Sequence, residues 1–111
     1  MTKSTVISLE HAFANLTFLK DRTPETPDNK KKDAFASLSE YGNGAVFIAH
    51  YAGDSQWERH SAGDELVHVL EGETTLILLQ DGREIANLMG QGDIMVVPQA
   101  VWPRATVSLA Y

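Results

Sequence analysis

The stretch from Trp57 to Glu73, WERHSAGDELVHVLEGE, decides the fold of this chain. It places Glu58, His60 and Glu65 just ahead of an apolar run that ends at Gly72. The residues SAGD are typical of a tight turn, and a glycine after the run suits a turn that needs a positive φ. The stretch therefore predicts two short strands joined by a turn, with polar side chains where they meet.

Short apolar segments of the same kind continue through the chain from Ala45 onward, and turns that contain glycine separate them. Asp81–Gly82 is the strongest turn signal, because this dipeptide suits the positive φ angles of a tight hairpin. Six or more short strands with regular turns predict an all-β fold, either an antiparallel sandwich or a barrel. The segments are AVFIAHY (45–51), DELVHVLEG (64–72), TTLILLQ (74–80), REIANLM (83–89), IMVVP (94–98) and RATVSLAY (104–111).

The first part of the chain has a mixed pattern and is expected to form an N-terminal arm over residues 1–40, ahead of a β-barrel over residues 41–111. SLEHAFANL (8–16) predicts a short helix, with Ser8 as its N-cap and apolar residues at helical spacing. DRTPETPDNKKK (21–32) has two prolines and many polar residues, which predicts a loop. DAFASLSEYGNG (33–44) fits either a short helix or an irregular arm.

The composition limits the classes of partner. A chain of 111 residues is long enough for one domain with a core. The net charge of −6 argues against nucleic acid, because phosphate binding needs a basic face and Lys30–Lys32 is the only basic run. The absence of cysteine excludes disulfides and thiolate metal ligands. The N-terminus has no long apolar segment, so we expect no signal peptide, no membrane span and a cytoplasmic location.

Glu58, His60 and Glu65 are the candidate metal ligands. Alternate residues of a strand share a face, so Glu58 and His60 are expected to project together, with Glu65 opposite them on the next strand. Buried carboxylates are costly unless a cation compensates their charge, and one imidazole with two carboxylates suits iron, manganese or zinc. The alternative is a solvated strand end in which these residues pair with Arg59 or Arg104.

The two stretches WERHSAGDELVHVLEGE and GDIMVVPQAVWPRA resemble the paired signature motifs of the cupin superfamily. The resemblance covers the chain from about Tyr41 to its end. It implies a small jelly-roll β-barrel that is often dimeric. In the first motif the matching residues are Gly53, Glu58, His60, Glu65 and Gly72, with one residue fewer than usual between Gly53 and Glu58. In the second motif they are Gly92, Pro98, Ala100 and Pro103.

Two departures from the family pattern affect the site. Glu58 and Pro103 stand where the family usually has metal-binding histidines, and proline has no donor atom on its side chain. The resemblance therefore implies at most three protein ligands, Glu58, His60 and Glu65, with water in the open positions. His68 lies three residues after Glu65 and would face the other way unless a bulge intervenes.

Three further side chains flank the motifs and are candidate pocket residues. Trp57 and Trp102 either stack on a flat or sugar-like ligand or pack at the rim of the barrel. Arg104 either holds a ligand carboxylate or pairs with Glu58, and in a metal-free site we favour that pair as the stand-in for the cation.

These observations leave three functions open. The first is a metal-dependent small-molecule enzyme of the oxygenase or isomerase kind, with one divalent ion held by Glu58, His60 and Glu65. The second is a metal-free barrel that binds or senses a small molecule without catalysis. The third is an interaction module whose barrel only supports a dimer. Because the last predicted strand is short, one sheet edge is left open, which favours a homodimer.

Overall fold

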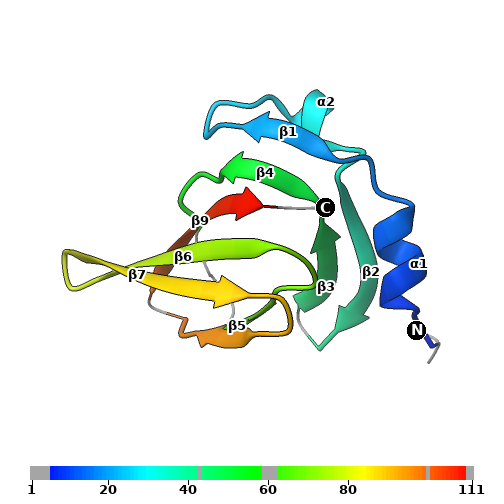
Figure 1. Ribbon diagram of the computed structural model, residues 1–111. Helices are drawn as coiled ribbons and strands as arrows, with labels where there is room; N and C mark the ends of the chain where they lie inside the picture. The colour runs from blue at the N-terminus through cyan, green and yellow to red at the C-terminus, as the bar shows by residue number, and fades with distance from the viewer. Residues whose placement is uncertain (1–5, 43, 59–62, 100, 110–111) are drawn as a thin grey trace.

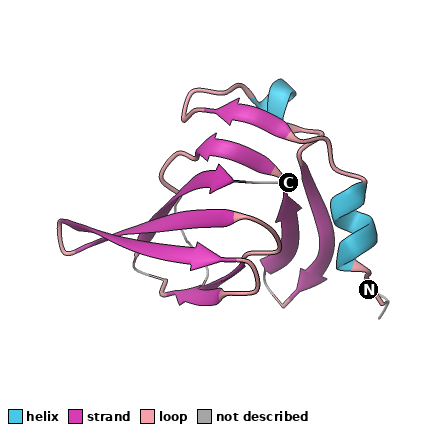
Figure 2. Ribbon diagram, viewed as in Figure 1, coloured by secondary structure: helices cyan, strands magenta, loops and turns pink. Residues whose placement is uncertain are grey.

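The computed structural model describes residues 6–42, 44–58, 63–99 and 101–109, which are mostly in strands (Figure 2). This confirms the predicted all-β class. The helices are α1 (Leu9–Ala14) and α2 (Asp28–Lys31). The strands are β1 (Leu19–Arg22), β2 (Phe35–Tyr41), β3 (Gly44–Ala49), β4 (Tyr51–Asp54), β5 (Glu65–His68), β6 (Glu73–Gln80), β7 (Arg83–Gly90), β8 (Ile94–Val97) and β9 (Trp102–Leu109).

The described strands form one larger sheet and two ribbons, and no closed barrel is found among them. The larger sheet has the order β1-β4-β9-β6-β7, and the ribbons are β2–β3 and β5–β8. All strand pairs are antiparallel except β1 with β4. Figure 1 shows the β6–β7 hairpin projecting from one end of the molecule, while α1 lies beside the β2–β3 ribbon at the other.

The hairpin between β6 and β7 forms as the dipeptide Asp81–Gly82 predicts. Both turn residues have positive φ, 54° for Asp81 and 74° for Gly82, and the pairing runs without a break from Gln80 opposite Arg83 to Glu73 opposite Gly90. A turn with two positive φ angles matches the right-handed twist of the flanking strands, which explains why a local dipeptide determines the register of eight residue pairs.

Helix α1 also forms as predicted. The Ser8 side chain accepts a hydrogen bond from the backbone N–H of His11 at 3.2 Å, which satisfies one of the free donors at the helix start. The helix ends at Asn15, whose N–H bonds to the carbonyl of His11. His11 itself is exposed.

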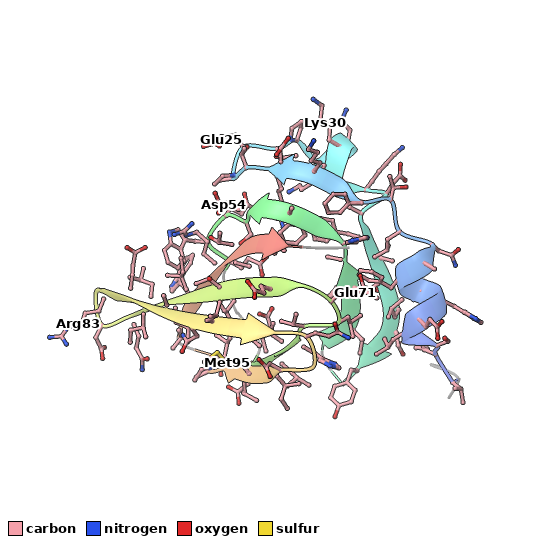
Figure 3. The ribbon with its side chains drawn as sticks, in the orientation of Figure 1. Glu25, Lys30, Asp54, Glu71, Arg83 and Met95 are labelled. Carbon is pink, nitrogen blue, oxygen red and sulfur yellow. The ribbon has the colours of Figure 1, made fainter. Side chains whose placement is uncertain are left out.

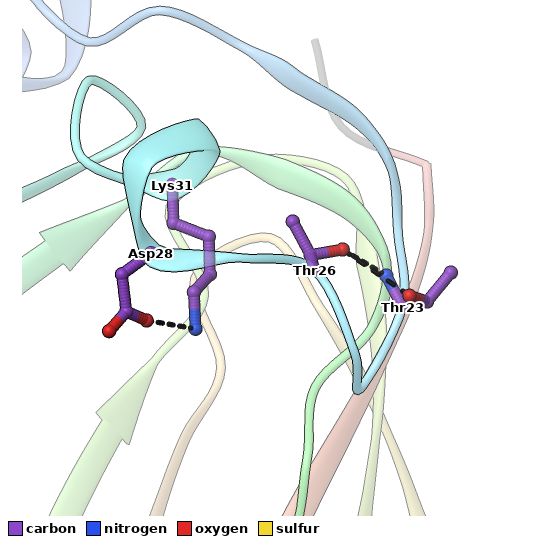
Figure 4. Close-up of polar contacts among 4 residues, drawn as sticks. All are labelled: Thr23, Thr26, Asp28 and Lys31. Carbon is purple, nitrogen blue, oxygen red and sulfur yellow. Dashed lines mark hydrogen bonds and ion pairs between the residues drawn. The ribbon is translucent and has the colours of Figure 1, made fainter.

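The predictions for residues 21–32 and 33–44 were wrong. Residues 21 and 22 end strand β1, α2 forms one turn within the first of these segments, and the second forms strand β2. For β1 the physical reason is pairing with a distant strand, β4. Strand β2 pairs with β3, the next strand along the chain, in an antiparallel hairpin that runs from Tyr41 opposite Gly44 to Phe35 opposite Ala49. In α2, Lys31 pairs with Asp28 at 3.2 Å, and ahead of it Thr26 accepts a hydrogen bond from the Thr23 N–H (Figure 4).

The core lies between the inner face of the larger sheet and the β5–β8 ribbon. Strand alternation turns Leu76 and Leu78 of β6 inward, together with their β9 partners Ala105 and Pro103. Val97 of β8 is fully buried against this face. The buried core residues are Val69, Leu76, Leu78, Met89, Val97 and Val101, with Val67, Met95 and Ala105 packed against them.

Gly53 allows β1 and β4 to lie against each other. A Cβ atom at this position would lie 2.2 Å from the Arg22 carbonyl oxygen and 2.6 Å from the Arg22 nitrogen, and the φ of Gly53 is +114°. Only glycine satisfies both requirements. No helix of the described residues is long and apolar enough to cross a membrane.

Candidate functional site

The two motif segments lie side by side along β9. The Ser55 N–H donates to the Ala105 carbonyl at 2.9 Å, and the Ala105 N–H donates to the Ser55 hydroxyl at 2.9 Å. Further on, the Glu58 N–H donates to the Pro103 carbonyl at 3.0 Å. The backbone of Glu58 in the first segment is therefore hydrogen-bonded to the backbone of Pro103 in the second. We call Trp57, Glu58, Glu65, Trp102, Pro103 and Arg104 the motif end of the molecule.

The structure places two of the three candidate metal ligands. Glu58 is exposed, whereas Glu65 is half-buried and opens β5 on the face that it shares with Val67, a neighbour of the core. His60 lies outside the described residues. Within the part of the chain that the structure describes, no three His, Asp or Glu side chains are grouped closely enough to hold a metal ion.

His68 points away from Glu65, as strand alternation predicts. The pairing of β5 with β8 is regular over all four residues, from Glu65 opposite Val97 to His68 opposite Ile94, so no bulge reverses its direction. His68 is exposed. It cannot replace the donor that is lost at Pro103, whose own side chain is buried on the inward face of β9.

Arg104 contacts Trp57 and not Glu58. Its guanidinium carbon lies 5.3 Å from the centre of the Trp57 ring, a cation–π arrangement. The pair with Glu58 favoured from the sequence is not among the ion pairs of the described residues. The reason is that Arg104 lies between two inward residues of β9 and therefore points outward. Trp102, two residues earlier on the same face, is 41% exposed, so both residues lie on the outward face of the larger sheet.

Tyr51 is a site residue that the sequence reading missed. Burial raises the pKa of its hydroxyl above the ordinary value of 10.0, the negative charge of Glu58 raises that pKa further, and the nearby Arg22 opposes the shift. The Tyr51 ring stacks on Phe35 at 5.7 Å. The Arg22 guanidinium, only 6% exposed, lies 4.4 Å from the Tyr51 ring centre.

A cavity of about 360 Å³, which we call the interior cavity, lies between β3 and the inner face of the larger sheet and opens to solvent beside the exposed side chains of Phe47 and Leu66. Its volume falls within the range of small-molecule sites. Tyr51 and Thr74 are the lining residues that carry hydroxyl groups, whereas Ile48, Val67, Ala105 and Val107 contribute apolar surface. Tyr51 is also the residue whose pKa the charge of Glu58 helps to raise.

One similar protein is found by comparison with curated proteins. The chain is 36% identical over 78 residues to "Uncharacterized protein YdbB" of Bacillus subtilis (strain 168), an alignment that covers 70% of this chain and 62% of that protein. No family model matches the chain. No solved structure matches it either.

Proposed function

We propose that this chain is a small-molecule-binding protein built on a cupin-type jelly-roll barrel, with its ligand in the interior cavity. The motif spacing supports the family, and the hydrogen bond from Glu58 to Pro103 supports the pairing of the two motifs. The observation on which the function rests is the position of Tyr51, which lines the cavity and responds electrostatically to Glu58.

The cavity suits a compact, mainly apolar ligand with one polar group. Its apolar walls exclude water and favour hydrocarbon, with a gain of about 25 cal/mol for each Å² of apolar surface removed from water. The hydroxyl of Tyr51 is protonated at neutral pH, because its pKa lies above 10.0. It therefore serves as both donor and acceptor for the polar group.

Binding of N-phenyl-naphthylamine, a neutral apolar fluorophore, tests this function. We expect a saturable rise in fluorescence with one dye per chain. Ala105→Leu adds bulk to a residue that lines the cavity and should weaken binding at least tenfold. Ala86→Leu makes the same change on an exposed residue of β7 and should leave binding unchanged. Equal binding by both variants would rule out the interior cavity as the site.

A metal-assisted enzyme is the second candidate function, and the pairing of the two motif segments favours it. The carboxylates of Glu58 and Glu65 fit a hard divalent cation such as iron, manganese or zinc, and His60 would complete the set. Bound there, the ion would act as a Lewis acid on a substrate that enters from the cavity. The role of the chain would be to orient this substrate with Tyr51 and Thr74.

Elemental analysis of protein purified without chelator tests the metal. One equivalent of a divalent ion, lost in both His60→Ala and Glu65→Gln, would support the enzyme. The control is His68→Ala, which changes an exposed histidine on the other face of β5 and should retain the metal. A metal content that is well below one equivalent, and is the same in the native protein and in His60→Ala, would contradict this candidate.

We also propose that a second copy of the chain covers the outward face of the β5–β8 ribbon. Leu66, Ile94 and Val96 on this face are 63%, 62% and 55% exposed, which is unusual for neighbouring large apolar side chains. Light scattering should give twice the chain mass for the native protein and the single mass for Leu66→Lys. A monomeric native protein would contradict the dimer and leave the ligand site untouched.

A further inference from the structure

An open groove of about 540 Å³ lies at the end of the molecule opposite the β6–β7 hairpin, between α1 and the loop from β5 to β6. Figure 3 shows Glu71 at this end, beside α1, while Arg83 marks the hairpin tip. Leu9, Phe13 and Leu70 contribute apolar walls. We call Leu9, Glu10, Phe13, His50, Leu70 and Glu71 the helix end.

Two polar atoms at the helix end are buried without a hydrogen-bond partner among the described residues. They are Nε2 of His50 and Oε2 of Glu71, and both residues line the groove. A buried polar group without a partner destabilises the free protein, so a ligand that supplies the missing hydrogen bonds is stabilised by them. Two such atoms on residues that line one groove indicate a polar recognition point.

The His50 ring is fixed before any ligand arrives. Its backbone N–H donates to the Ala34 carbonyl at 2.9 Å, and its carbonyl accepts from the Leu19 N–H at 3.1 Å. The ring lies 4.2 Å from the Phe13 ring centre and 4.7 Å from that of Phe18. Because these contacts hold the imidazole in place, little side-chain entropy is lost on binding.

The charges of the groove select a cation. Glu71 and the exposed Glu10 are its charged lining residues, and neither lysine nor arginine lines it. A carboxylate accepts hydrogen bonds only, and the Nε2 atom of a neutral imidazole can accept another. An ammonium group supplies three donors and a positive charge, and Phe13 adds an aromatic ring to the lining, which is favourable near a cation.

The helix end also forms the mouth of the interior cavity, because Leu9, Phe13, His50, Leu70 and Glu71 line both spaces. A ligand held at Glu71 therefore has an apolar space behind it. The matching molecule carries its charge at one end and hydrocarbon at the other.

We infer that the helix end is the recognition site for the head group of an amphiphilic organic amine. Its ammonium donates to Oε2 of Glu71 and Nε2 of His50, and its apolar chain extends into the interior cavity. The placement of the apolar chain rests on the proposed function, whereas the placement of the ammonium rests on the two unpaired atoms alone.

Calorimetric titration with octylamine and with octanol tests this inference, because the two molecules share a chain and differ in the head group. We expect octylamine to bind the native protein at least tenfold more tightly than octanol. Glu71→Gln keeps the shape and removes the charge, so it should remove this preference and leave octanol binding as it was. Glu73→Gln, an exposed neighbour at the start of β6, is the matched control and should keep the preference.

The outcomes separate this inference from the proposed function. Equal affinity of the native protein for octylamine and octanol would overturn the amine site and leave the interior cavity in place. This comparison needs no variant. The same loss of preference in Glu71→Gln and Glu73→Gln would overturn the role of Glu71. Absence of binding by both molecules would overturn both proposals.

Discussion

The motif end and the helix end differ in how the sequence marks them and in what the structure provides. The motif end carries the family-like spacing, yet Glu58 is exposed and Trp102 and Arg104 lie on the outward face of the larger sheet. The helix end carries no recognisable motif, yet it opens into the two cavities and holds two unpaired buried polar atoms. In this chain the recognisable pattern and the groove with unpaired buried polar atoms lie in different regions.

The motif glycines explain this difference. Gly53, Gly72 and Gly92 have φ angles of 114°, 76° and 88°, a conformation that other residues rarely adopt. The spacing of the motifs therefore reflects the backbone turns of the fold. Glu58 and Pro103, which stand between these turns, are not constrained by the turn geometry in the same way.

Substitution of Gly53 is the strongest test of this explanation and has the largest expected effect. Gly53→Ala forces a Cβ atom to within 2.2 Å of the Arg22 carbonyl oxygen in addition to the strain of a φ of +114°. We expect a loss of at least about 3 kcal/mol in the free energy of unfolding, measured by urea denaturation.

Gly82→Ala provides the control for that measurement. Gly82 also has a positive φ, +74°, but a Cβ atom there meets nothing within 4 Å. Its substitution should cost about 1 kcal/mol, from the backbone conformation alone. If the two variants lose equal stability, the close approach of β1 to β4 is not what requires a glycine in the first motif.

The pH dependence of stability tests whether the pKa of the Tyr51 hydroxyl is raised in the folded chain. Because the pKa of Tyr51 is raised in the folded chain, its hydroxyl stays protonated while the unfolded chain begins to ionise near pH 10. The associated stability is fully present below pH 10 and is lost as the pH rises through the folded pKa. Thermal unfolding should therefore show a shallower decline above pH 10 for Tyr51→Phe than for the native protein.

Tyr41→Phe is the matched control, because Tyr41 is 79% exposed. It should follow the native pH dependence. The contribution of Glu58 is separable in the same experiment: Glu58→Gln removes a charge that raises the pKa of Tyr51, so ultraviolet titration should give a lower pKa for that hydroxyl. An unchanged pKa would show that Glu58 does not act on the Tyr51 hydroxyl.

The smallest expected effect is on the contact between Arg104 and Trp57. Arg104→Ala removes the guanidinium from the face of Trp57 and should cost about 0.5–1 kcal/mol, the usual value for an exposed cation–π pair. Arg83→Ala, at the hairpin tip in Figure 3, should change stability by less than about 0.5 kcal/mol. A double-mutant cycle with Trp57→Leu measures the pair itself, and a coupling of zero would contradict the contact.

The elements that the sequence predicted correctly depend on local signals. Ser8 identified the start of α1, and Asp81–Gly82 identified the β6–β7 hairpin. Strand β2 was missed although it pairs with the next strand along the chain, from Tyr41 opposite Gly44 to Phe35 opposite Ala49. Strand β1 escaped prediction because its partner is remote: Leu19 pairs with Tyr51. Such pairs form through tertiary contacts that override local preference.

The candidate site shows the same contrast between local signals and contacts that form only in the fold. The sequence singled out the two segments that contain Glu58 and Pro103, and the structure joins them by a backbone hydrogen bond, whereas the favoured pair of Glu58 with Arg104 is not found among the described residues. The helix end was not predicted, because His50 and Glu71 are 21 positions apart in the sequence and meet only through the fold. The one available signal was His50 itself, a titratable side chain between two apolar strand segments.

The position of β9 has a consequence for how the chain folds. This strand is the middle one of the larger sheet, and the other four strands of that sheet all precede it in the sequence. The β6–β7 hairpin can form early from local contacts, whereas β4 has no bridge to that hairpin until β9 arrives. Because pairs such as Gly53 with Val107 close long loops, we expect slow folding in which docking of the last strand joins two preformed halves.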